Sequence, residues 1–178
     1  MDLGPAPSLP SLPSSHPVGV DFLMGKKTPL VEVRESEIQG RGVYAARPIK
    51  KGTWIIEYTG ERISHAEADM RYDDENMERH HTFLFTIDEH VCIDAFIGGN
   101  EARYVNHSCD PNCETVLAEG EIHIVAMREI AAGEELTYDY GYTLDEESVE
   151  EALRRYPCRC GTAQCKGTIL RLEKTPNS

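Results

Sequence analysis

The sequence predicts a mainly β fold with short helices, and three features support this prediction. Five short runs, at residues 30–34, 43–47, 53–58, 82–87 and 91–94, are rich in β-branched and aromatic residues, as strands are. Two more runs, at 113–118 and 121–127, flank a Glu119-Gly120 step that is typical of a hairpin turn. Strands and helices do not alternate with a βαβ rhythm, which argues against a doubly wound parallel sheet.

Two short helices are expected between these strands. The first covers residues 64–71, because Ser64 is a good N-cap and Glu67 stands at the capping-box position. The second covers residues 146–156, which are acidic at the start and basic at the end, as the helix dipole favours.

The domain organisation follows from length and composition. A chain of 178 residues with 40% hydrophobic residues suits one domain with a core and flanking tails. Residues 1–27 are Pro/Ser-rich and are expected to form a disordered tail. Residues 28–143 then form the main domain, 144–156 an acidic linker helix and 157–173 a cysteine-bearing segment.

Charge and hydropathy limit the partners. With 31 acidic against 18 basic residues the net charge is −13, so direct nucleic-acid binding is not expected. This charge favours a cationic, lysine-rich partner, although it can also serve solubility alone. No apolar run reaches the roughly 20 residues of a membrane span and no secretory signal is present, so we expect no membrane partner and an intracellular, reducing location.

The cysteines predict a zinc site. Cys158, Cys160 and Cys165 form a CxCxxxxC pattern, the tight spacing of tetrahedral thiolate sites. A closed structural site needs a fourth ligand, and the spacing leaves Cys92, Cys109 and Cys113 as candidates. Cys92 lies in an apolar run, where a buried, inert thiol is the simpler interpretation.

Three further segments concentrate polar and aromatic groups. The Gly-x-Gly turn at residues 39–44 allows close approach of a ligand to the backbone, although most such turns are merely turns. Residues 103–113 (RYVNHSCDPNC) contain His107, which alone would be interpreted as a structural histidine. In residues 135–140 (ELTYDY), Tyr138 and Tyr140 face the same side if the segment is extended. The two rings could then line a narrow slot, or they could be half-buried core residues.

Together, these segments give the chain a recognisable order of motifs. GRGVYA (40–45), EYTGE (57–61), RYVNHSCDPNC, ELTYDY and the CxCxxxxC cluster succeed one another in that order. The chain thereby resembles, from about residue 30 to 170, the SET-domain protein lysine methyltransferases with a post-SET zinc motif. The resemblance implies a fold of small twisted β-sheets with a C-terminal pseudoknot and a zinc-bound post-SET segment at 157–173. It also implies two cofactors, S-adenosyl-L-methionine and a structural Zn²⁺.

The resemblance also assigns roles to residues. Implied methyl-donor contacts are Gln39, Gly40, Arg41, Gly42, Tyr72, Arg103, Asn106, His107 and Tyr140. Implied catalytic residues are Tyr140, Tyr138 and Tyr58, and the implied substrate channel consists of Tyr58, Phe83 and Tyr138. The implied zinc ligands are Cys109, Cys158, Cys160 and Cys165.

The implied activity is methylation of lysine in a histone tail or another lysine-rich protein. A tyrosine at position 138 implies mono- or dimethylation, because its hydroxyl takes space in the channel. No cysteine-rich segment precedes the SET core, so the chain resembles a stand-alone member, nuclear or chromosomal if eukaryotic or acting on a host and cytoplasmic if bacterial. A silent SET module that only binds a peptide and a zinc-stabilised interaction domain are the alternatives.

Overall fold

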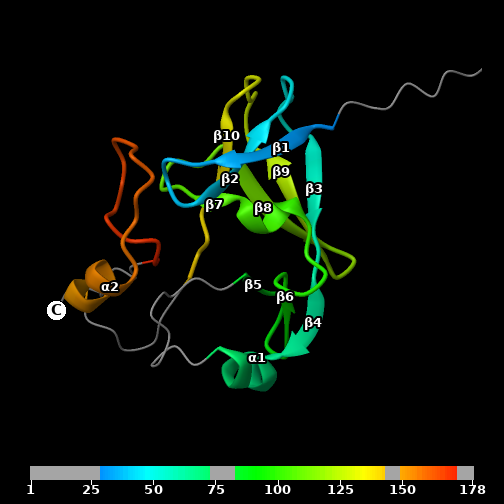
Figure 1. The fold of residues 1–178 in the computed structure, drawn as a ribbon, viewed down its shortest axis with the longest axis vertical. Helices are drawn as coiled ribbons and strands as arrows, with labels where there is room; N and C mark the ends of the chain where they lie inside the picture. Colours follow the sequence, from blue (N-terminus) through cyan, green and yellow to red (C-terminus); the bar gives the residue numbers. More distant parts are fainter. Residues whose placement is uncertain (1–28, 73–82, 143–148, 172–178) are drawn as a thin grey trace, which may run out of the picture.

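The computed structural model describes residues 29–72, 83–142 and 149–171, which form three small β-sheets with short helices (Figure 1). The sheets contain four, three and three strands, so the mainly β prediction is confirmed. Residues 1–28, which include the expected tail at 1–27, lie outside the described part of the chain. No helix of the described part is long and apolar enough to cross a membrane.

The four-stranded sheet joins segments that are distant in sequence. Its order is β1 (Val31–Glu35), β2 (Arg41–Ala45), β10 (Glu135–Tyr138) and β7 (Asn106–His107). β10 runs antiparallel to β2 but parallel to β7, with Tyr138 opposite His107. The segments RYVNHSCDPNC and ELTYDY, separated in sequence, therefore lie side by side in one sheet.

The second sheet contains β3 (Trp54–Tyr58), β9 (Glu121–Ala126) and β8 (Cys113–Ala118) in that order. The predicted hairpin is confirmed, because β8 and β9 pair antiparallel from Cys113–Ala126 to Ala118–Glu121. Glu119 and Gly120 both have positive φ, at 52° and 83°. Two such residues are what a two-residue hairpin turn requires.

The third sheet contains β4 (Glu61–Ser64), β6 (Val91–Asp94) and β5 (Leu84–Thr86). The strand expected at 91–94 is confirmed, and that expected at 82–87 is shorter. The strand expected at 43–47 instead begins at Arg41, because the ladder to β1 extends back through Gly42 to Arg41. β4 was not predicted.

The helices are short, as expected. In α1 (His65–Arg71), Ser64 Oγ accepts the backbone N–H of Glu67 at 3.2 Å, and the Glu67 carboxylate pairs with Arg71. The second predicted helix appears as α2 (Val149–Arg155), while residues 143–148 before it lie outside the described part. A 3₁₀ turn, η1 (Glu101–Tyr104), leads into β7 and was not predicted.

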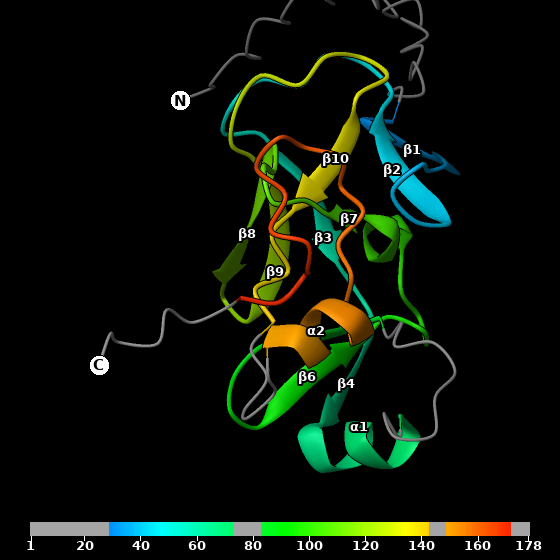
Figure 2. The same cartoon turned by 90° about the vertical axis from the view of Figure 1, so that its left-hand side faces the viewer.

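A buried core links the first two sheets. Its fully buried large side chains include Val43 from β2, Ile124 from β9 and Leu136 from β10. Figure 2 shows the segment after α2 crossing in front of β10 and β9. This segment also meets the end of the β10 segment through a bridge between Tyr142 and Leu170.

One buried amide fastens β10 to the loop that follows β7. The Nδ2 atom of Asn112 donates to the Glu135 carbonyl at 2.7 Å and to Glu134 Oε1 at 3.0 Å, while its Oδ1 accepts Thr137 N–H at 2.9 Å. Asn112 is almost fully buried, so water cannot replace these partners.

We expect Asn112→Ala to lower the free energy of unfolding by about 2–3 kcal/mol, because buried backbone groups of β10 would lose their partners. Denaturant titration measures this change. Asp110→Ala, an exposed position in the same loop, is the control and should change stability by less than about 0.5 kcal/mol. Equal stabilities of the two variants would contradict the fastening role.

Candidate active site

A row of aromatic rings lies at the end of β10. The rings of Tyr138 and Tyr140 are 5.0 Å apart, so the two tyrosines face one side as the extended pattern predicts. Tyr138 is buried and Tyr140 is partly exposed. The hydroxyl of Tyr140 donates to the Val105 carbonyl at 3.0 Å, which fixes the phenol beside the segment leading into β7.

The other expected channel residues approach this row through β5. The Tyr58 hydroxyl donates to the Phe83 carbonyl at 2.9 Å, so Tyr58 and Phe83 are brought together. Phe85 connects them to the row, because its ring lies 5.3 Å from Tyr58 and 6.2 Å from Tyr138. The structure therefore gathers Tyr58 and Tyr138 around Phe85, which the sequence interpretation missed. The Phe83 ring instead packs against Tyr104, at 5.8 Å between ring centroids.

Burial controls the protonation of these phenols. It is the main cause that raises the pKa of Tyr58, Tyr138 and Tyr140 above the ordinary value, with coulombic interactions among tyrosines adding to it. Each hydroxyl therefore keeps its proton at neutral pH and acts as a neutral hydrogen-bonding group.

His107 connects the tyrosine row to the cysteines. Its Nδ1 accepts the backbone N–H of Tyr140 at 3.1 Å, and its Nε2 lies 3.5 Å from Cys109 Sγ. Burial lowers the pKa of His107, which outweighs the opposite effect of Asp139. The neutral imidazole with its proton on Nε2 is thus the form that satisfies both contacts.

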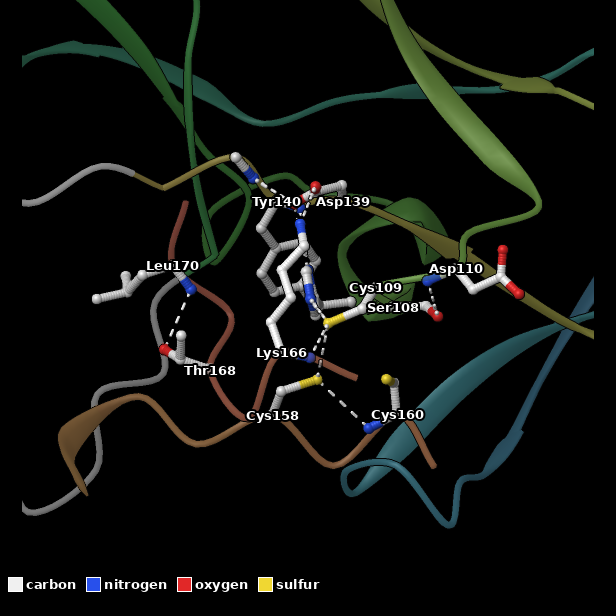
Figure 3. A network of polar contacts seen from close by, with 12 residues as sticks. Ser108, Cys109, Asp110, Asp139, Tyr140, Cys158, Cys160, Lys166, Thr168 and Leu170 are labelled. Carbon is white, nitrogen blue, oxygen red and sulfur yellow. Dashed lines mark hydrogen bonds and ion pairs between the residues drawn. The ribbon is translucent and has the colours of Figure 1, made fainter. Parts of the chain in front are cut away.

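Four cysteines converge on one point beside His107. The sulfur atoms of Cys109, Cys158, Cys160 and Cys165 all lie within 4.8 Å of one another. Figure 3 shows Cys109 approaching Cys158 and Cys160, and the Sγ atoms of Cys109 and Cys158 are 3.7 Å apart. Tetrahedral zinc with Zn–S bonds of about 2.3 Å requires S–S separations of about 3.8 Å.

The surroundings of the four sulfurs favour thiolates. Lys166 N–H points at Cys109 Sγ at 3.3 Å, and Cys160 N–H points at Cys158 Sγ at 3.4 Å. Burial nevertheless raises the pKa of both Cys109 and Cys158, whereas hydrogen bonds outweigh burial at Cys160 and lower its pKa to about 6. A bound cation is therefore needed to hold Cys109 and Cys158 as thiolates. Cys92 and Cys113 are buried elsewhere, in the core clusters.

The glycine turn lies against β7. Nδ2 of Asn106 donates to the Arg41 carbonyl at 3.0 Å and lies 3.4 Å from the Gln39 carbonyl, so the turn and Asn106 are brought together as expected. Gly40 has φ of +49° with open space where a Cβ would stand. At Gly42 a Cβ would overlap Glu135 Oε1, so this glycine is required by a neighbouring side chain.

Arg103 has one unused donor beside the aromatic rings. Its guanidinium donates from Nη1 to the Ala95 carbonyl at 3.0 Å and from Nη2 to the Tyr104 hydroxyl at 2.7 Å. Its Nε is buried and has no hydrogen-bond partner among the described residues. A buried charged donor without a partner is costly, which suits a site for an anionic ligand group.

Tyr72 binds the end of β6, next to the residue whose carbonyl accepts the Arg103 guanidinium. Its hydroxyl donates to the buried carboxylate of Asp94 at 3.0 Å, one residue before Ala95. Burial, followed by the Asp94 hydrogen bond, raises the pKa of Tyr72 to about 12. The described hydrogen bonds therefore tie Tyr72 to β6.

A cavity of about 700 Å³ flanks the glycine turn. One wall consists of Arg34, Glu35, Glu37, Ile38, Tyr44 and Glu135, and the other of Arg159, Cys160 and Gly161. The cavity thus lies between the turn and the cysteine segment, whereas Asn106 and His107 are buried outside its lining.

Sequence reasoning missed several residues of the site. Phe85 follows Phe83 by two positions, so the period-two argument used for the tyrosines would have found it. Tyr104 lies under both Arg41 and Arg103, at 5.4 and 4.7 Å from its ring centroid. Glu135 binds side chains from distant strands, and no local pattern signals that.

Comparisons with known proteins agree with this geometry. The family model described as the SET domain matches residues 40–141. The chain is 41% identical over 140 residues to Histone-lysine N-methyltransferase trr of Drosophila melanogaster, covering 76% of this chain and 6% of that protein. It is 39% identical over 159 residues to Histone-lysine N-methyltransferase 2B of Homo sapiens, covering 84% and 6%.

A solved structure gives the same result. A chain in the crystal structure of the Chaetomium thermophilum polycomb repressive complex 2 (PRC2) superposes with a TM-score of 0.59 at 36% identity, covering 65% of this chain and 16% of that one. The present chain spans only a small part of each of these relatives. The matched residues nevertheless include the glycine turn, the Asn106–His107 strand and the tyrosine row, and the chain belongs to the SET-domain family.

Proposed function

We propose that this chain is an S-adenosyl-L-methionine-dependent protein-lysine N-methyltransferase. The observation that carries the proposal is the tyrosine row beside β7. The neutral phenols of Tyr138 and Tyr140 lie at the end of β10, which pairs both with β2 of the glycine turn and with Asn106–His107. Arg103, just before β7, has a buried Nε without a hydrogen-bond partner among the described residues. Such a site can bind a charged donor and a lysine chain side by side.

The donor-binding residues fit S-adenosyl-L-methionine. Its carboxylate would meet Arg103 Nε, the buried donor that lacks a partner among the described residues. Its adenosine would lie against Gln39–Gly42, Asn106 and His107, where Gly40 leaves open space. Tyr72, anchored on Asp94 near Arg103, would cover this end. When bound, the sulfonium supplies an already activated methyl group.

The protein must then orient a neutral lysine amine. Lysine has a pKa near 10.4, so only roughly one amine in a thousand is neutral at pH 7. The aromatic channel of Tyr58, Phe83 and Tyr138 disfavours the ammonium form, because it offers apolar surface instead of water. The Tyr140 hydroxyl, fixed by Val105, would orient the amine at near-attack distance.

The four-cysteine cluster would hold a structural Zn²⁺. Cys109 comes from the loop after β7 and the other three from the C-terminal segment, so one ion would join the two. These four cysteines are the ligands that the SET resemblance implies, and the proximity of their sulfur atoms supports the proposal. The ion would keep the C-terminal segment over the site and would take no part in methyl transfer.

A histone tail is the proposed substrate, and chromosomes in the nucleus the proposed location. A protein of Saccharomyces cerevisiae named Histone-lysine N-methyltransferase, H3 lysine-4 specific, is 38% identical over 166 residues, which are 87% of this chain and 14% of that one. The net charge of −13 also favours a lysine-rich partner.

The direct test incubates the purified chain with S-adenosyl-L-methionine carrying a labelled methyl group and with each of the core histones in turn. We expect label on a histone lysine, located by mass spectrometry. Tight donor binding without transfer to any histone or other lysine-rich protein would contradict the proposal and favour a silent peptide-binding module. If the chain does not bind S-adenosyl-L-methionine, the remaining interpretation is a zinc-stabilised interaction domain.

Tyr138 is expected to limit product multiplicity. Its buried hydroxyl lies in the channel, 5.0 Å from Tyr140 between ring centroids, so Tyr138→Phe frees room for a more methylated amine. We expect the wild type to stop at mono- or dimethyl-lysine and Tyr138→Phe to add one further methyl group, measured by mass spectrometry. An unchanged product distribution would contradict this role.

A further inference from the structure

The carboxylate of Glu135 collects donors from three other strands or strand ends. Oε1 accepts the Ser36 hydroxyl at 2.7 Å and Asn106 Nδ2 at 2.8 Å. Oε2 accepts the Tyr44 hydroxyl at 2.9 Å and, more weakly, Ser36 at 3.0 Å. We infer that Glu135 is a positioning residue, which fixes the glycine turn so that the proposed methyl donor can bind.

The contacts of Glu135 reach both ends of the turn. At the start, Ser36 Oγ, which donates to Glu135, accepts the backbone N–H of Ile38 at 3.0 Å. At the end, Asn106 uses the same amide nitrogen for Glu135 and for the Arg41 carbonyl at 3.0 Å. One carboxylate thus anchors the two side chains that hold the backbone of residues 38–41.

Gly42 supports the same assignment. A Cβ at position 42 would overlap Glu135 Oε1 and would lie 3.0 Å from Ser36 Cβ. Gly42 therefore gives the carboxylate space, whereas Gly40 provides the positive φ of the turn. Of the two glycines in the motif, only Gly40 leaves open space that a ligand could approach, because the space beside Gly42 is filled by the Glu135 carboxylate.

In this inference, Glu135 influences donor binding through the side chains that it holds and does not contact the donor itself. Three protein groups already donate to the two carboxylate oxygens, namely the Ser36 hydroxyl, the Tyr44 hydroxyl and the Asn106 amide. The three donor side chains are neutral, so each bond to the ionised carboxylate is charge-assisted and stronger than one between neutral groups. Glu135 also lines the cavity beside the turn.

The test is Glu135→Gln, which keeps the volume but replaces one acceptor oxygen with a donor nitrogen. We expect the Kd for S-adenosyl-L-methionine, measured by calorimetry, to rise about tenfold, with kcat at saturating donor changed less than about threefold. In the donor-free protein, hydrogen exchange of the amides of residues 38–42 should accelerate about tenfold. A group that merely stabilised the fold would not move this local exchange selectively.

Glu134→Gln is the matched control. It also removes one carboxylate charge, from the adjacent residue, whose partners are Arg128, Asn112 and the backbone of Ala131. We expect its donor Kd to stay within about twofold of the wild type. If Glu135→Gln does not fold, Ser36→Ala replaces it, because this change removes the link from the carboxylate to Ile38.

The outcomes separate this inference from the proposed function on which it rests. A folded Glu135→Gln or Ser36→Ala with wild-type exchange at 38–42 overturns the inference, whatever its affinity. Weaker donor binding with unchanged exchange would mean that Glu135 touches the donor itself. A wild-type chain that binds no S-adenosyl-L-methionine overturns the proposed function instead, while the exchange measurement still decides whether Glu135 positions the turn.

Discussion

Tyr140→Phe is expected to lower kcat at least about 100-fold while leaving the Kd for S-adenosyl-L-methionine within about threefold. The variant keeps the ring, which packs 5.0 Å from Tyr138 and 5.3 Å from His107, and so keeps the packing of the site. It loses the hydroxyl that Val105 fixes and that we propose to orient the amine. Steady-state kinetics and calorimetry measure the two quantities separately.

Tyr142→Phe is the control for this experiment. Its ring lies 5.6 Å from Tyr140, and its hydroxyl donates to the Leu84 carbonyl at 3.3 Å. Removing that hydroxyl should reduce kcat less than about threefold. If Tyr140→Phe instead lost donor binding together with thermal stability, Tyr140 would be a structural residue.

The second large effect concerns the metal. We expect the purified protein to contain about one zinc ion per chain, measured by mass spectrometry of the metal, and Cys109→Ser to lose most of it. Activity should fall more than about tenfold, and hydrogen exchange in residues 157–171 should rise. The reason is that Cys109 joins the C-terminal segment to His107 and hence to the backbone of Tyr140.

Cys113→Ala tests the assignment of the fourth ligand. Cys113 is a core residue on β8, and its replacement should reduce stability while the zinc content stays at one per chain. Full activity after complete chelation, or loss of zinc from Cys113→Ala without loss from Cys109→Ser, would contradict the proposed site.

The sequence predicted those elements that depend on residues close together in the chain, such as a turn or a helix cap. The β8–β9 hairpin depends on Glu119 and Gly120 in the positive-φ region, and α1 begins where Ser64 caps it. β4 was missed because it is four residues long with one buried side chain, Ile63, too little for an alternating pattern. It is a strand because it pairs with β6, which the sequence of β4 does not reveal.

The features of the site that residue patterns could not predict depend on contacts between residues far apart in the sequence. Asn106–His107 is a strand only because β10 lies parallel beside it, and two residues have no periodicity. With Cys92 interpreted as a buried thiol, spacing could not choose between Cys109 and Cys113. The SET resemblance selected Cys109, which the structure places in the cluster. The contacts of Glu135 with Ser36, Tyr44 and Asn106 span 99, 91 and 29 positions, beyond any local rule.

The position of β10 between β2 and β7 also sets the order of events during synthesis. The β1–β2 hairpin can form as soon as it leaves the ribosome, but one edge of β2 stays unpaired until Glu135 and Leu136 have been translated. Such long-range pairing slows folding and leaves an open edge in the nascent chain. The glycine turn emerges early, yet its binding geometry is expected to mature only after ELTYDY has emerged.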